Sequence, residues 1–63
     1  MMSLADVKAK VEWEGGIGAA LNYGLRAEDI ADPALAKLWA EAVAINRDLE
    51  SVVAEIRKAL SDG

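Results

Sequence analysis

A chain of 63 residues without cysteine or histidine can bury only a small core, and it has neither disulfides nor the usual zinc ligands to stabilise that core. Its thirteen alanines, single proline and hydrophobic fraction of 54% favour an all-α fold. The net charge of −4 is spread over both halves, unlike the clustered Lys and Arg of a nucleic-acid-binding surface. We therefore expect no nucleic-acid partner, and association between copies as the remaining source of stability.

The distribution of charge also argues against a membrane protein. The longest uncharged run, 15–25, has eleven residues, whereas a membrane-spanning helix needs about twenty. Charged residues at Asp6, Lys8, Lys10, Glu12 and Glu14 interrupt the N-terminal segment, which differs from the apolar block of a secretory signal. We expect a cytoplasmic location and no membrane partner.

The first expected element is a helix over 4–23. Ser3 is a suitable N-cap, and the apolar residues that follow fit one half of a helix surface. Glu14 projects into that apolar half, and Gly15 and Gly16 follow it directly. Because each glycine disfavours a helix interior by about 1 kcal/mol, the alternative is a helix that kinks at this pair.

The segment 24–32 is expected to be a loop. Gly24 is the expected C-terminal cap of the first helix, and the residues 27–31 are expected to form a short helical turn. Loops held by a rigid scaffold often carry recognition. The candidate partner-binding residues of this loop are Tyr23, Arg26, Glu28 and Asp29.

The clearest element is a helix over 33–60. Asp32 and Pro33 are favoured residues for an N-cap and a first helical position. Apolar residues then recur at alternating steps of three and four, at Leu35, Leu38, Ala42, Ile45, Leu49, Val52, Ile56 and Ala59, with Val53 and Leu60 widening the stripe. A helix of that length extends roughly 42 Å, whereas a compact globule of this size is about 27 Å across. The sequence thus predicts an elongated molecule.

These elements predict an all-α helical hairpin of two long antiparallel helices that pairs into a homodimeric four-helix bundle. On the side of the second helix away from its main stripe runs a row of small residues, Ala36, Ala40 and Ala44, where another helix can approach closely. The candidate oligomer interface comprises Trp13, Ile17, Leu21, Ala36, Trp39, Ala40, Val43 and Ala44. Two alternatives stay open: alanine is also the best helix former, and the tryptophans are also ordinary core residues.

The sequence offers little for catalysis. It contains no histidine to act as a base near neutral pH and no cysteine nucleophile. Its acidic residues lack the Glu-x-x-His motif of carboxylate metal sites in helical bundles. We therefore predict no enzyme activity, no catalytic residues, no cofactor and no metal.

A short motif offers another interpretation. Glu14-Gly15-Gly16 followed by Ile17-Gly18-Ala19-Ala20 resembles the double-glycine junction at which export proteases cut the leaders of small bacteriocins. The resemblance implies a secreted peptide precursor, although the five basic and eight acidic residues after Gly16 differ from the cationic mature peptides of that group.

The main functional expectation is a structural or protein-interaction module that acts as a homo-oligomer. Its principal alternative is an adaptor whose apolar seam binds a helix of a different protein.

Overall fold

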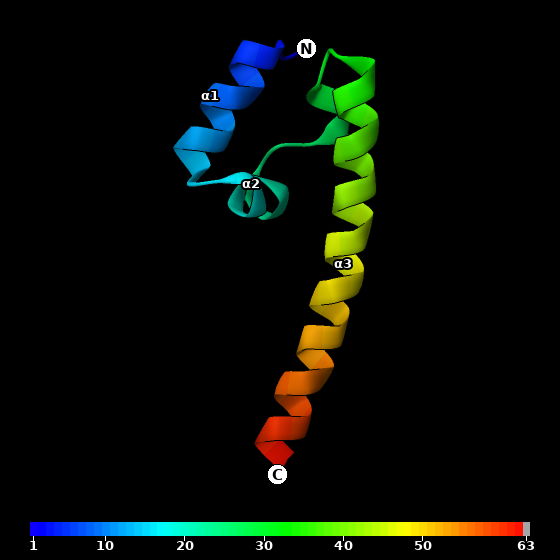
Figure 1. Ribbon diagram of the computed structural model, residues 1–63. Coiled ribbons are helices and arrows are strands. Elements are labelled where there is room, and N and C mark those ends of the chain that lie inside the picture. The colour runs from blue at the N-terminus through cyan, green and yellow to red at the C-terminus, as the bar shows by residue number, and fades with distance from the viewer. Residues whose placement is uncertain (63) are drawn as a thin grey trace.

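The computed structural model describes residues 1–62, and in that range the chain is all-α, as predicted. The elements are α1 (Leu4–Glu14), α2 (Ile17–Tyr23), the 3₁₀ turn η1 (Ala27–Asp29) and α3 (Pro33–Asp62). The segment 1–31, called the head from here on, gathers beside the N-terminal half of α3, and the C-terminal half of α3 projects away from it (Figure 1).

A capping box begins α1. The backbone N–H of Asp6 donates to Oγ of Ser3 at 3.2 Å, and the backbone N–H of Ser3 donates to the Asp6 carboxylate at 3.2 Å. The two bonds satisfy N–H groups that have no partner within the helix. The predicted N-cap at Ser3 is confirmed.

The single helix expected over 4–23 is wrong, because the glycine pair divides it into α1 and α2. Gly15 adopts a left-handed conformation with φ of 97°, and the Gly16 N–H donates to the carbonyl of Val11 at 2.9 Å, which closes α1. Gly16 has φ of 134° and precedes α2. These backbone angles suit glycine and are unfavourable for residues with a Cβ. The chain therefore changes direction here, and α2 packs against α1 (Figure 1).

The predicted loop and the start of the last helix are both confirmed. Gly24 ends α2, and η1 lies within the expected turn. Asp32 caps α3, since its carboxylate accepts the N–H of Leu35 at 2.9 Å. The helix runs to Asp62, two residues beyond the predicted end.

The N-terminal residues are tied to the segment that precedes α3. Met2 forms a parallel bridge with Ile30. Its N–H donates to the carbonyl of Asp29 at 2.6 Å, and its carbonyl accepts from Ala31 at 2.9 Å. The bridge therefore holds the start of the chain beside the buried Ile30, within the head.

The core lies between the head and the first turns of α3. It consists of Val7, Ala20, Leu25, Ile30 and Trp39. Trp39 is 5% exposed, and its indole N–H donates to the carbonyl of Leu25 at 2.9 Å. This bond satisfies two buried polar groups and joins α3 to the loop after α2.

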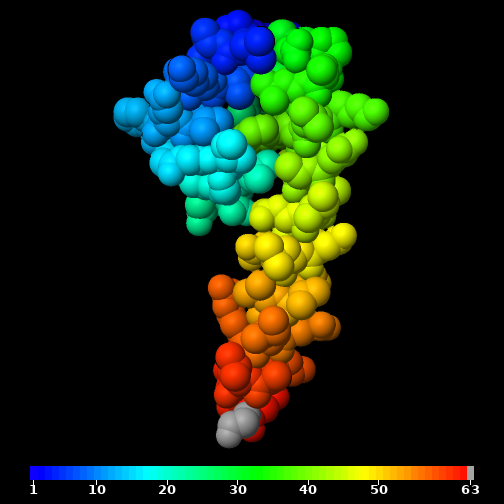
Figure 2. Space-filling view, in the orientation of Figure 1, coloured from blue at the N-terminus to red at the C-terminus, as the bar shows by residue number. Residues whose placement is uncertain are grey.

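The overall architecture differs from the predicted hairpin of two long antiparallel helices. One long helix is accompanied by a short head that covers only its N-terminal half (Figure 2). The molecule measures 47 × 21 × 11 Å, and its radius of gyration is 14.3 Å, compared with about 11 Å for a compact chain of this length. The predicted elongation is confirmed.

The two tryptophans provide a matched test of this core. We expect Trp39→Phe to lower the free energy of unfolding by at least about 1–3 kcal/mol, because the Leu25 carbonyl loses its buried donor. Trp13→Phe, at a side chain that is 84% exposed, should change it by less than about 0.5 kcal/mol. Urea unfolding followed by far-UV circular dichroism measures both, and equal losses would contradict the core described above.

The glycines provide a second matched test. Gly15→Ala should lower stability by about 1–2 kcal/mol, because an L-residue is strained at a positive φ. Gly18→Ala should raise it by roughly 0.5–1 kcal/mol, since Gly18 lies inside α2 and an added Cβ meets nothing within 4 Å. Thermal melting of the two variants gives opposite shifts if the break is at Gly15, and increases in both if the helix is continuous.

Candidate interaction surface

The most extensive apolar surface of the molecule runs along α3. Six large side chains on one side of the helix are between 51% and 76% exposed. They recur at the spacing of a single helix face. This surface, called the α3 stripe below, comprises Leu38, Ile45, Leu49, Val52, Ile56 and Leu60.

The stripe points away from the face that α3 uses inside the chain. The inward face carries Trp39, with Leu35, Ala36 and Val43 packed beside it. At about 100° per residue, the centre of the stripe lies roughly a quarter turn from Trp39. The head therefore leaves the stripe uncovered even where it packs on α3.

The C-terminal half of α3 is more open still. From Arg47 to Asp62 every residue except Val53 is exposed. The last side-chain bond between α3 and the head that we identify joins Asn46 to Asn22, with 2.7 Å between Nδ2 of Asn46 and Oδ1 of Asn22. Four residues of the stripe lie beyond that bond: Leu49, Val52, Ile56 and Leu60.

Charge is unequal on the two edges of the stripe. One edge, the acidic edge, carries Glu41, Asp48, Glu55 and Asp62 at intervals of seven, all of them exposed. The other, the neutral edge, carries Asn46, Val53 and Leu60, also at intervals of seven, with Leu60 shared between this edge and the stripe. In paired helices these edge positions flank the apolar contact and influence which helices pair and in which direction.

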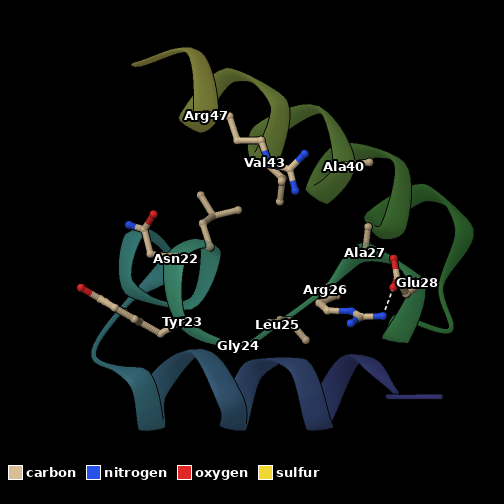
Figure 3. A pocket seen from close by; sticks show the side chains of 11 residues that line it. Asn22, Tyr23, Gly24, Leu25, Arg26, Ala27, Glu28, Ala40, Val43 and Arg47 are labelled. Carbon is tan, nitrogen blue, oxygen red and sulfur yellow. Dashed lines mark hydrogen bonds and ion pairs between the residues drawn. The ribbon is translucent and has the colours of Figure 1, made fainter. Parts of the chain in front are cut away.

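A groove of about 710 Å³ lies between α3 and the loop that follows α2, on the side of α3 away from the stripe (Figure 3). Its walls include Leu21, Leu25 and Val43, and two guanidinium groups, Arg26 and Arg47, line it. Arg26 is paired with Glu28. The groove is open, and apolar side chains share its lining with these charged groups.

The candidate partner-binding residues of the loop are only partly gathered at this groove. Tyr23, Arg26 and Glu28 line it. Asp29 is not among the lining residues, and its backbone carbonyl accepts the N–H of Met2.

The residues chosen as an oligomer interface fall in different environments. Trp39 is buried in the core, with Ala36 and Val43 packed against it. Leu21 and Ala40 line the groove. The exposed ones are Trp13, Ile17 and Ala44, together with Ala40. They do not form one continuous surface.

The sequence predicts contact between chains along the alanine row, on the side of α3 away from the stripe. The structure uses the face between these two for its own core, centred on Trp39. A signal was present: the first segment, divided by two glycines, is too short to cover a helix that extends roughly 42 Å.

Neither a metal centre nor a membrane-spanning segment is found in the described part of the chain. In residues 1–62, no three His, Cys, Asp or Glu side chains gather where they could hold a metal ion. Among the helices of that range, none combines the length and the apolar character needed to cross a bilayer.

Comparison with models of protein families, with curated proteins and with solved structures finds no match to this chain.

Proposed function

We propose that this chain is a self-associating helical module in which two copies pair through the α3 stripe to form a homodimeric bundle. The observation that carries the proposal is the continuity of the stripe, which stays exposed from Leu38 to Leu60, while only five of the residues in 1–62 are buried. Contiguous apolar surface of this kind is typical of protein–protein interfaces.

The exposed area of the chain supports the same proposal. A compact monomer of 6.7 kDa exposes about 3,900 Å² by the usual scaling. This chain exposes 4779 Å², which is an excess of about 900 Å². A stable interface of standard size buries about 800 Å² on each partner. The excess is therefore close to what one dimer interface would remove from water.

The length of unsupported helix is a further argument. Residues 47–62 form more than four turns of α3 that extend past the head. An isolated helix of about 12–15 residues is only marginally stable in water, and most helices in proteins depend on packing of an apolar face. Pairing of two stripes would provide that packing along the whole of α3.

The second candidate function is an adaptor that binds a helix of a different protein along the same stripe. It is favoured by the same exposed apolar side chains, which can accept a helix of another protein with a matching apolar face. Neither function requires enzyme activity. The two are separated by the mass of the isolated protein, because an adaptor is monomeric without its partner.

We expect light scattering behind size exclusion to give twice the mass of the chain, with helicity falling as the protein is diluted. Leu49→Glu should weaken the dimer by at least about a hundredfold, or about 2.7 kcal/mol, because it places an unpaired charge in the middle of the stripe. Ala54→Glu is the matched control, since Ala54 is exposed on the other side of α3 and should leave the mass unchanged.

Ala40→Glu tests the alanine row as an alternative interface. A loss of dimer in this variant, with Leu49→Glu unaffected, would move the interface to the groove side of α3. A fully helical monomer for the unmodified chain would favour the adaptor function. A mass of four chains would replace the dimer by a tetramer in which four copies of α3 pack through their stripes. Leu49 alternates with the β-branched Ile45 and Val52 along the seam, a pattern that is compatible with four helices.

A further inference from the structure

We propose that copies of α3 associate in parallel, with their heads at the same end of the assembly. This inference rests on the proposed self-association, and it adds the direction of the pairing. It follows from the unequal charge of the two edges of the stripe.

With Ala42 and Ala59 between its larger side chains, the stripe repeats every seven positions from Leu38 to Ala59, and this repeat defines how the edges of two paired helices meet. In a parallel pair, each acidic edge lies against the neutral edge of the other copy. Asp48 would then face Val53 of the second copy, and Glu55 would face Leu60 of the second copy. The carboxylates stay at the exposed rim, where they face uncharged side chains and meet no like charge.

An antiparallel pair brings like edges together. The antiparallel register that aligns most of the stripe places Ala42 of one chain against Ala59 of the other. In that register Asp48 faces Glu55 of the second copy, and Glu41 faces Asp62 of the second copy. By symmetry this gives four facing pairs of carboxylates, and no basic residue occupies either acidic edge. Like charges placed opposite one another disfavour such an arrangement.

The position of the head is compatible with the parallel pair. The head packs on the Trp39 face of α3, roughly a quarter turn from the centre of the stripe. A two-fold axis along the paired helices therefore carries the two heads to opposite sides of the bundle. Both would remain free at one end, with the groove beside Arg26 and Arg47 open on each.

Three alanine-to-cysteine variants test the direction of pairing, and the native chain contains no cysteine to interfere. Ala42 and Ala59 lie on the seam of the stripe, towards opposite ends, and Ala54 lies on the far side of α3 as the matched control. Each full-length variant is incubated in a glutathione redox buffer, and covalent dimer is measured by non-reducing electrophoresis. A disulfide requires the two Cα atoms to be about 4.4–6.8 Å apart.

For the parallel pair we expect Ala59→Cys alone and Ala42→Cys alone to form covalent dimer at least about tenfold faster than Ala54→Cys. Mixing the two variants should give no additional preference for the mixed product. Cross-linking that occurs only when Ala42→Cys and Ala59→Cys are mixed would overturn the parallel direction and leave the proposed self-association intact. A monomeric mass, with all three variants at the rate of the control, would overturn both proposals.

Discussion

The buried hydrogen bond from the Trp39 indole to the Leu25 carbonyl fixes how α3 is rotated about its own axis. A tryptophan of this size, placed among Val7, Ala20 and Ile30, occupies most of the small core. Because its N–H must find a partner when buried, the indole can sit in that core in few orientations. The faces of α3 on either side of Trp39 are then assigned, one to the groove and the other to open solvent.

The break at Gly15 and Gly16 determines how much of α3 the rest of the chain can cover. A continuous helix over 4–23 would have run beside α3 for some 30 Å. The left-handed Gly15 ends α1 after eleven residues, and the chain changes direction before it forms the seven residues of α2. The head is consequently broad and short, and α3 extends past it as an isolated helix (Figure 1).

The exposed half of α3 is chemically patterned rather than merely uncovered. The apolar stripe has acidic residues on one edge and uncharged residues on the other. Parallel and antiparallel pairs of α3 therefore bring different edges together and differ in stability. For a chain with no disulfides, association through such a stripe provides stability that the five-residue core lacks. In the proposed dimer, burial of apolar surface along the long last helix therefore supplies stability that the small core does not.

The sequence by itself determined the all-α class, the caps at Ser3 and Asp32, the turn near Ala27 and the long last helix, because these depend on neighbouring residues only. At the glycine pair, the sequence was compatible with both a bend and a continuous helix. Which of them occurs, and which face of α3 lies inward, was decided by tertiary structure. Several faces of α3 are apolar enough to be buried, and only the fit of Trp39 beneath the Leu25 carbonyl distinguishes between them.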